Sequence, residues 1–334
     1  MNSNNITKIV AEMACSHDGS YGLMKKIIDA SFHGGADVIQ LQIWKLKHMM
    51  TPSRNLYKKL KDIEFSYTQW GRIVEYTRKE YPTLMIYVCV YEHNSLDFIN
   101  SLGVDGYKIN SSDLTNYLVL EKISSYNKKT NLSVGASSLG EIQFALDKLQ
   151  QNESLPITLM YGHQNFPTHP SQVNLNYMKT LGELFDLPYG YQDHCDADEE
   201  SAYWLPAASI GMNASIIEKH ITHDRSLKGV DHESALNPDE FAQFVKMVKT
   251  IDSAKGKNKP HSFSESEISY RKFQKKTVVA AKKILAGDPI TTDNIYFMRA
   301  EKLGVTPDQV NQIIGRKVKS AIEAYQVLKF DDVL

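Results

Sequence analysis

The chain has 334 residues, 42% hydrophobic and 23% charged, which is the composition of a folded globular protein and not of a disordered one. Its 38 basic and 39 acidic residues give a formal net charge of -1 without a long run of one sign. This balance argues against nucleic acid or an anionic membrane as partner and favours a small-molecule ligand. The length predicts a large domain followed by a small one.

Cysteine usage and the N-terminus indicate a cytoplasmic protein. Cys15, Cys89 and Cys195 are widely spaced and form no C-x-x-C pair, so we expect neither a disulfide framework nor a cysteine-built zinc site. Residues 1–5 are polar and lack the features of a signal peptide. No apolar run approaches the roughly 20 residues that span a bilayer.

Eight short apolar runs of strand length recur along the first 221 residues, separated by stretches with helical periodicity. They cover residues 8–14, 37–44, 84–91, 106–110, 131–135, 157–161, 189–193 and 215–221. The helical stretches include 22–33, 97–103, 139–149 and 202–211, and several end at a glycine. Eight such units over about 250 residues predict an α/β fold of the (β/α)₈, or TIM-barrel, type. A doubly wound open sheet is the alternative, which the absence of G-x-G-x-x-G after a strand disfavours.

A domain boundary is expected after the barrel. The stretch 253–267 is rich in Lys, Ser, Gly and Pro and has no apolar periodicity, which is typical of a linker. We therefore predict a barrel domain over 1–255, a linker over 256–275 and a small domain over 276–334.

Polar residues gather where the predicted strands end, which is where barrel enzymes carry their active sites. Glu12 ends the first run, Gln40 and Gln42 the second, Lys108 the fourth, and Glu218 and His220 the eighth. Because inward residues alternate along a strand, Glu218 and His220 should point the same way, and a buried Glu should face Lys108, a ligand or a metal. A satisfied ionic layer that only fills the barrel is the competing interpretation.

His194 and His220 end neighbouring strands and form a candidate metal site. Two imidazoles with nearby carboxylates and without cysteine favour Mn²⁺, Mg²⁺, Fe²⁺ or Co²⁺ over zinc. The alternative is a pair of hydrogen-bonded core histidines.

Read together, several motifs resemble the N-acetylneuraminate (sialic acid) synthase family, which includes the pseudaminic and legionaminic acid synthases. They are AEMACSHDGS, GADVIQLQIWK, GYKINSSDLTN, LSVGASSLGEI, FPTHPSQVNL, LPYGYQDHC and IIEKHITHDRSLKGVDHESALNPDEF. The C-terminal VVAAKKILAGDPITTDNIYFMRA and GRKVKSAI look like the antifreeze-like, or SAF, domain of the same family.

The resemblance implies condensation of phosphoenolpyruvate (PEP) with the open-chain aldehyde of an N-acylated hexosamine, giving a nonulosonic acid and phosphate. By position in the motifs, it implies a divalent cofactor, with Mn²⁺ expected and Mg²⁺ or Co²⁺ as alternatives, held by His194 and His220. It makes Glu12 a catalytic carboxylate and assigns Lys108, Ser111 and Ser133 to PEP. Asp113 and Asp231 would lie near the sugar. Arg299 would reach from the SAF domain into the barrel of a neighbouring subunit, in a domain-swapped homodimer.

The chain departs from the family pattern at four expected substrate-binding positions. Gln40 stands where the family has a lysine, and Cys89 lies where a strand-three hydroxyl is usual. Gln192 replaces a strand-seven serine, and Gln164 replaces a member of the polar pair before Pro167. These changes weaken the expected phosphate pocket, because a charge-assisted hydrogen bond is stronger than a neutral one.

Two alternatives to the PEP reaction follow. One is a related aldol-type synthase with another donor or acceptor, which the changes at Gln40 and Cys89 favour. The other is a sugar-binding or regulatory homologue without turnover, which the presence of Glu12, Lys108 and both histidines argues against.

Overall fold

A computed structural model of the chain describes residues 6–150, 154–256 and 260–334. It divides into two compact units, Met1–Gly256 and Lys257–Leu334, and each is treated by itself below. The polar segment 1–5 and residues 257–259 of the predicted linker lie outside the described residues. In the described part, no helix is both long and apolar enough to cross a membrane.

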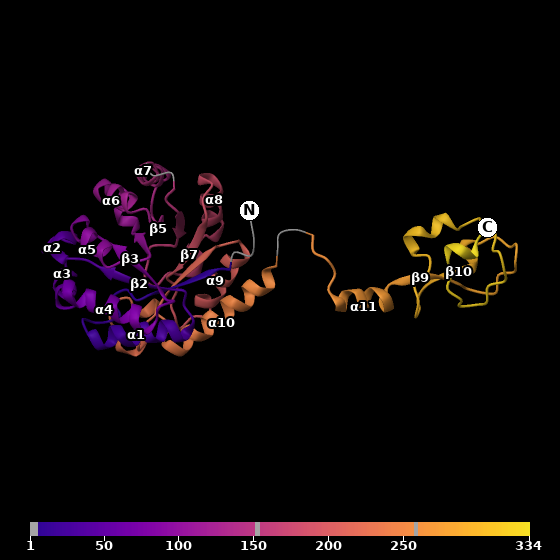
Figure 1. Cartoon of the computed structure of the whole chain (residues 1–334), viewed down its shortest axis with the longest axis horizontal. Helices are drawn as coiled ribbons and strands as arrows, with labels where there is room; N and C mark the ends of the chain where they lie inside the picture. Colours follow the sequence, from indigo (N-terminus) through magenta and orange to yellow (C-terminus); the bar gives the residue numbers. More distant parts are fainter. Residues whose placement is uncertain (1–5, 151–153, 257–259) are drawn as a thin grey trace. The chain divides into compact units, whose positions relative to one another are not determined.

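The first unit is a closed barrel of eight parallel strands, which confirms the predicted TIM barrel (Figure 1). The strands are β1 (Lys8–Glu12), β2 (Val38–Ile43), β3 (Met85–Val90), β4 (Gly106–Ile109), β5 (Lys129–Ser133), β6 (Ile157–Tyr161), β7 (Tyr189–Asp193) and β8 (Ile216–His220). Each pairs with its neighbour in sequence, and β8 closes on β1 with Glu12 opposite His220. Seven of the predicted runs contain one of these strands, and the run 131–135 overlaps β5, which starts two residues earlier.

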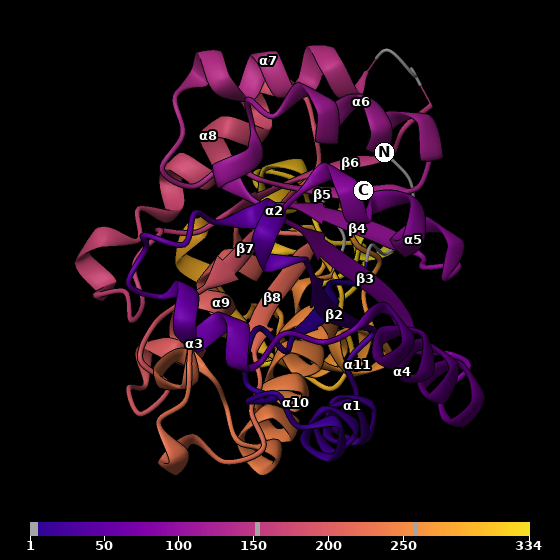
Figure 2. The ribbon, with the colours of Figure 1, turned by 90° about the vertical axis from the view of Figure 1, so that its left-hand side faces the viewer.

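Helices surround the barrel (Figure 2). They are α1 (Tyr21–Gly34), α2 (Leu46–Met49), α3 (Tyr57–Asp62), α4 (Tyr67–Glu80), α5 (Leu96–Ser101), α6 (Tyr117–Tyr126), α7 (Leu139–Leu149), α8 (Leu175–Phe185), α9 (Ser201–Gly211) and α10 (Pro238–Lys255). Short 3₁₀ turns are η1 (His93–Ser95), η2 (Ser111–Asp113), η3 (Pro170–Gln172), η4 (Arg225–Leu227) and η5 (His232–Ser234). Serine caps begin several helices; Ser66 and Ser138 each form a capping box, which satisfies backbone N–H groups of the first turn.

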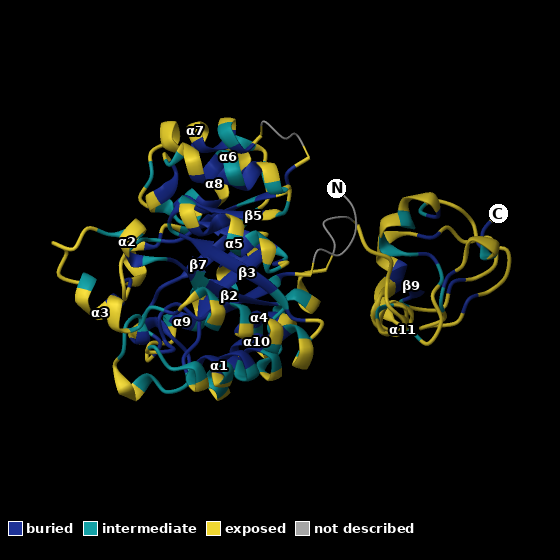
Figure 3. Cartoon of the chain, turned by 60° about the vertical axis from the view of Figure 1, so that its left-hand side comes forward, coloured by how far each residue is buried: buried dark blue, intermediate teal, exposed yellow. Residues whose placement is uncertain are grey.

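Residue alternation gives the strands two different faces. Outward residues such as Ile9, Ile39 and Val88 join one large core with the helices, and Figure 3 shows the strands buried beneath the partly exposed helices. Inward residues Val10, Val38, Tyr87, Met160 and Ile216 form a separate apolar cluster inside the barrel. Above this cluster the inward positions turn polar, so an apolar base supports a polar mouth.

The second unit holds α11 (Glu265–Gln274) and two antiparallel strands, β9 (Lys276–Ala280) and β10 (Ile295–Arg299). It also contains the turns η6 (Thr292–Asn294), η7 (Pro307–Gln312) and η8 (Phe330–Asp332). Its core is built from Val278, Ile284, Ile290, Val318, Leu328 and neighbouring apolar residues. The predicted linker over 256–275 contains the helix α11 among its described residues. Ser264 and Glu267 form a capping box that starts this helix, and none of its residues is buried, so apolar periodicity could not reveal it.

Candidate functional site

The carboxyl ends of the strands carry the predicted site residues of the first unit. Eight of them lie on the strands themselves, at inward positions: Glu12, Gln40, Gln42, Cys89, Lys108, Ser133, Gln192 and His220. His194 directly follows β7. All these side chains except that of Gln42 are buried, so the structure brings them together inside one mouth.

A chain of polar contacts runs from β5 through β7 and β8 and then across the barrel to β4. Ser133 Oγ donates to Gln192 Oε1 over 2.8 Å, and Gln192 Nε2 donates to Glu218 Oε1 over 3.2 Å. The same Glu218 oxygen forms an ion pair with the Lys108 ammonium group, and both side chains are buried. Burial opposes the charge of Lys108, yet the carboxylates of Glu218 and Glu12 raise its pKa. Lys108 therefore keeps its positive charge inside the mouth.

Glu12 is held by three donors at the opposite wall. Its carboxylate accepts from the side-chain amide of Gln40, from Gln42 Nε2 over 3.2 Å, and from the Ala14 backbone N–H over 2.6 Å. Burial raises the pKa of Glu12 to about 7, with Lys108 opposing this shift. Glu12 can thus exchange a proton near neutral pH, as a general acid or base must.

Gln40 turns its amide N–H toward Glu12, while its Oε1 is buried without a partner in the described residues. A neutral side chain therefore occupies the position where a lysine was expected. The mouth gains a hydrogen-bond donor here and no positive charge.

His194 and His220 lie with their ring centroids 5.6 Å apart and their planes at 80°. The Nδ1 of His194 lies 2.8 Å from the carbonyl oxygen of His163; because a carbonyl only accepts, Nδ1 carries the proton and Nε2 keeps its lone pair. His220 Nδ1 is buried without a partner in the described part of the chain. Burial lowers the pKa of both rings, so both are neutral at pH 7, which is the metal-binding form.

These two imidazoles fit a divalent ion as two of its ligands, and the hydrogen bond to the His163 carbonyl oxygen orients the ring of His194. Among the described residues, the nearby carboxylates do not complete a ligand set around the two rings. Glu218 points to Lys108, and the described residues contain no group of three or more His, Cys, Asp or Glu side chains arranged to hold a metal. The remaining coordination positions would fall to water and substrate, as in open catalytic sites.

Cys89 replaces a hydroxyl with a buried thiol beside Lys108, its register partner. Burial raises the pKa of this thiol, and the charge of Lys108 only partly offsets the shift. A neutral thiol is a weak hydrogen-bond donor, so Cys89 contributes little to anion binding.

Gln164 follows β6 and donates from Nε2 to the Gly162 carbonyl oxygen over 3.4 Å. A Cβ at Gly162 would lie 2.9 Å from the Gln192 side chain, and one at Gly135 would lie 2.7 Å from Gln164 Nε2. The closest approach is to backbone, 2.4 Å to the Gln192 carbonyl oxygen for Gly162 and 2.1 Å to the Gly162 carbonyl oxygen for Gly135, so glycine at both positions permits the close packing of the strand ends beside the two glutamines.

Ser111 and Asp113 lie on η2, directly after β4. Asp113 accepts from Asn116 Nδ2 and Ser112 Oγ, each over 2.9 Å, and burial raises its pKa. Asp231 lies in the loop after β8 with φ +64°, in the left-handed region. Burial, followed by the charge of Glu233, raises the pKa of Asp231 to about 6. Neither aspartate forms an ion pair within the described residues.

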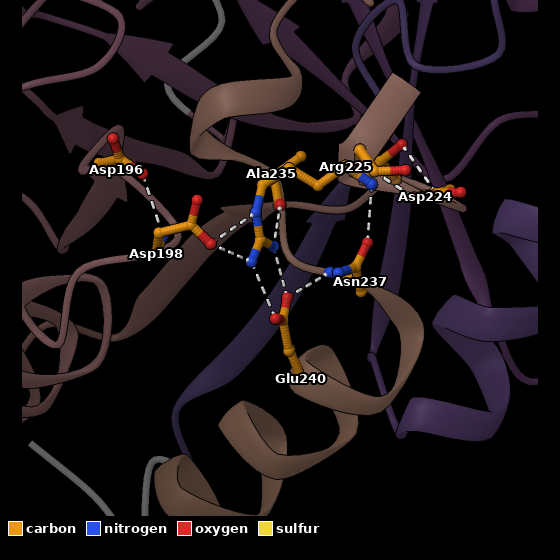
Figure 4. Close-up of polar contacts among 9 residues, drawn as sticks. Asp196, Asp198, Asp224, Arg225, Ala235, Asn237 and Glu240 are labelled. Carbon is orange, nitrogen blue, oxygen red and sulfur yellow. Dashed lines mark hydrogen bonds and ion pairs between the residues drawn. The ribbon is translucent and has the colours of Figure 1, made fainter. Parts of the chain in front are cut away.

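Arg225 fixes the loop that carries Asp231 (Figure 4). Its guanidinium group lies between Asp198 and Glu240. It also donates to the Ala235 carbonyl oxygen over 3.1 Å, and its backbone N–H donates to Asn237 Oδ1 over 2.8 Å. The clamp ties this loop to the loop after β7 and to the start of α10. A cavity of about 450 Å³ lies beside it, lined by Arg225, Asp198, Asn237 and neighbours.

Arg299 ends β10 in the second unit and is exposed. Its insertion into a neighbouring barrel stays a prediction.

Glu218 pairs with Lys108, as the alternation of inward strand residues indicated. Arg225, which holds the loop, was not among the predicted site residues. Arg225 had no such signal, because its partners lie 15 and 27 residues away in sequence.

Comparisons with known proteins place this geometry in a family. Residues 27–260 match the NeuB family, and residues 275–334 match the SAF domain. N,N'-diacetyllegionaminic acid synthase from Campylobacter jejuni is 30% identical over 93% of this chain and 95% of its own length.

Two solved structures are similar. N-acetylneuraminic acid (sialic acid) synthetase from Leptospira borgpetersenii aligns with a TM-score of 0.73 and 27% identity, over 80% of this chain and 92% of that one. A putative spore coat polysaccharide biosynthesis protein E from Chromobacterium violaceum aligns with a TM-score of 0.81 over 98% and 99% of the two chains; its identity of 20% supports the fold alone. The two relatives with a stated activity are synthases, which supports an enzyme. The chain belongs to the NeuB family and carries a C-terminal SAF domain.

Proposed function

We propose that this enzyme condenses PEP with the open-chain aldehyde of an N-acylated hexosamine, with a divalent metal, to give a nonulosonic acid and phosphate. Carbon 3 of PEP bonds to the aldehyde carbon, water adds to carbon 2, and phosphate leaves. The mouth carries the proposal: a fixed cation, a carboxylate with a pKa near 7 and two neutral imidazoles converge at the strand ends. The relatives' names, a legionaminic acid synthase and a sialic acid synthetase, support the product class.

The charge of each side chain in the mouth suggests its role. Lys108 would bind the carboxylate of PEP, with Ser111 and Ser133 as hydroxyl donors. Glu12, with its raised pKa, would orient the water and take its proton. Gln42, Gln164 and Gln192 would contact substrate through their amides.

His194 and His220 would hold the metal, for which we propose Mn²⁺, with Mg²⁺ or Co²⁺ as alternatives. When bound, the ion supplies Lewis-acid polarisation of the aldehyde oxygen. Asp113 and Asp231 would bind hydroxyl groups of the sugar.

We also propose a homodimer in which the SAF domain of each subunit supplies Arg299 to its partner's barrel. The exposed apolar side chains beside Arg299 on β10 support this: Tyr296, Phe297 and Met298 are 52%, 43% and 40% exposed. Apolar groups gathered on one short strand are typical of a surface that another chain covers.

A second candidate is a related condensation with another donor. It is favoured by the charge inside the mouth, where Lys108 is already paired with Glu218 and Gln40 is neutral. A donor with less negative charge than PEP would need no further cation.

The test is an assay of the purified chain with Mn²⁺, PEP and a panel of N-acylhexosamines and unsubstituted aldoses, following phosphate release and product mass. Release that requires both metal and one N-acylhexosamine supports the proposal. Product without phosphate release, from pyruvate or another donor, would favour the second candidate. Tight sugar binding without turnover would reject both.

A further inference from the structure

A second cavity lies at the opposite end of the barrel from the mouth. It has a volume of about 210 Å³ and is lined by residues at the beginnings of the strands, among them Lys8, Lys129, Asn131 and Ser215. Lys8 is the first residue of β1 and Lys129 the first of β5. These strands lie on opposite sides of the eight-stranded barrel, and both side chains line this cavity, where the charge of Lys129 acts on Lys8.

The two lysines bring uncompensated positive charge into this cavity. Burial lowers the pKa of Lys8, the ammonium group of Lys129 lowers it further, and Asp37 only partly opposes the shift. Among the described residues, neither lysine forms an ion pair; the nearby Asp37 carboxylate accepts from the Ile9 backbone N–H over 2.8 Å. The repulsion between the lysines is a free-energy penalty that a bound anion would remove.

Asn131 adds a donor without an acceptor. It lies two residues along β5 from Lys129, on the same face, and is 2% exposed. Its Nδ2 has no hydrogen-bond partner in the described part of the chain, which is costly for a buried amide. The nearby hydroxyls of Ser215 and Thr130 already donate to the carbonyl oxygens of Tyr189 and Lys128. The cavity therefore presents two ammonium groups and an amide N–H, all of them donors.

We propose that this cavity binds a small oxyanion, a phosphate or carboxylate group, between Lys8, Lys129 and Asn131. Only acceptors satisfy all three groups, and a negative charge also offsets the Lys8–Lys129 repulsion. The volume holds about seven water molecules, enough for one such group with a short organic part. Barrel enzymes carry their chemistry at the other end, so this site binds without catalysing.

Isothermal titration calorimetry of the full chain with inorganic phosphate, and separately with acetate, tests the proposal. Lys129→Met removes one cation at an exposed strand start, and Asn131→Leu removes the amide while filling its space. Either should weaken binding by about tenfold, the loss expected for one charge-assisted hydrogen bond. The stronger of the two anions identifies the preferred group.

Two matched variants serve as controls. Lys128→Met changes the neighbouring lysine, which lies outside the cavity over the Tyr107 ring, and should leave binding unchanged. Lys108→Met removes the cation of the mouth, so it subtracts any anion binding there, and the binding that belongs to this cavity should persist in that variant. The proposal is overturned if the unmodified chain binds neither anion, if Lys128→Met weakens binding as much as Lys129→Met, or if only Lys108→Met abolishes it. None of these results depends on whether the chain has synthase activity.

Discussion

Lys108 on β4 and Glu218 on β8 form a buried ion pair that spans the width of the barrel. Strands β4 and β8 lie on opposite sides of the closed sheet, so the pair lies between the inward apolar cluster around Val10 and Met160 and the polar mouth. A second buried pair, Lys219 with Asp193, lies on the outward face of the same region. The inward pair contains Lys108, which we propose to meet substrate, and the outward pair gives a comparison without such a role.

We expect Lys108→Met to lower the free energy of unfolding by about 3–5 kcal/mol, because it leaves the Glu218 carboxylate buried without its partner. The double variant Lys108→Met with Glu218→Met should recover much of this loss. Urea unfolding measures both. Lys219→Met should destabilise the fold similarly but leave PEP binding by the folded protein intact. Equal loss of PEP binding in both single variants would contradict the assignment of Lys108 to substrate.

Replacing His194 or His220 with alanine should weaken Mn²⁺ binding on the order of 100-fold, since a site with two protein ligands loses half of them. Calorimetric titration with Mn²⁺ measures the affinity directly, without an activity assay. His223→Ala is the control, because His223 lies in the loop after β8, near His232 and apart from the two rings. Unchanged Mn²⁺ affinity in His220→Ala would reject the metal site.

Glu12 should make the protein less stable as the pH rises. Its folded-state pKa is raised from 4.5 to about 7, so between these values the folded protein binds more protons than the unfolded chain. The free energy of unfolding then falls with increasing pH across this window, by on the order of a few kcal/mol in total. Urea unfolding between pH 5 and 8, with a chelator present, should show the fall in the unmodified chain. The slope should be absent or reduced in Glu12→Gln, and an identical slope would contradict the assignment.

The hydrophobic periodicity was sufficient to predict the barrel, because each strand is a short apolar run in which inward and outward residues alternate. The same alternation predicted that Glu218 and His220 point the same way and that a buried Glu faces Lys108, and Glu218 does pair with Lys108. It could not show what each side chain contacts. Gln192 was expected only as a lost serine, whereas it joins Ser133 to Glu218 through both ends of its amide.

Sequence patterns failed where the determining contacts are polar or distant. Helix α11 begins with a capping box and has no buried residue, so no hydrophobic pattern in the sequence predicts it. The Arg225 clamp joins residues from three segments, and only the folded chain brings them together.

Gln40→Lys tests whether the neutral side chain at position 40 weakens the binding of PEP. A lysine would restore a cation, and we expect the KM for PEP to fall on the order of tenfold. It would also pair with Glu12 and lower the pKa of that carboxylate. Gln40→Met, which removes the amide without adding charge, should not lower KM. A KM unaffected by either change would favour a donor other than PEP.

Arg225→Met should loosen the loop that carries Asp231 without touching the strand ends. The guanidinium group loses its bonds to Glu240, Asp198 and the Ala235 carbonyl oxygen, so the loop keeps few contacts to α10. We expect the KM for the sugar to rise on the order of tenfold, while Mn²⁺ affinity stays the same, because the histidines lie on or beside strands. Limited proteolysis should cut faster within residues 224–237. Asp198→Asn is the matched control: Asp198 is 77% exposed, so its pair with Arg225 is screened and should contribute little. If Arg225→Met raised the KM for PEP and sugar equally, or left the loop as resistant to protease as before, the clamp would not be what positions Asp231.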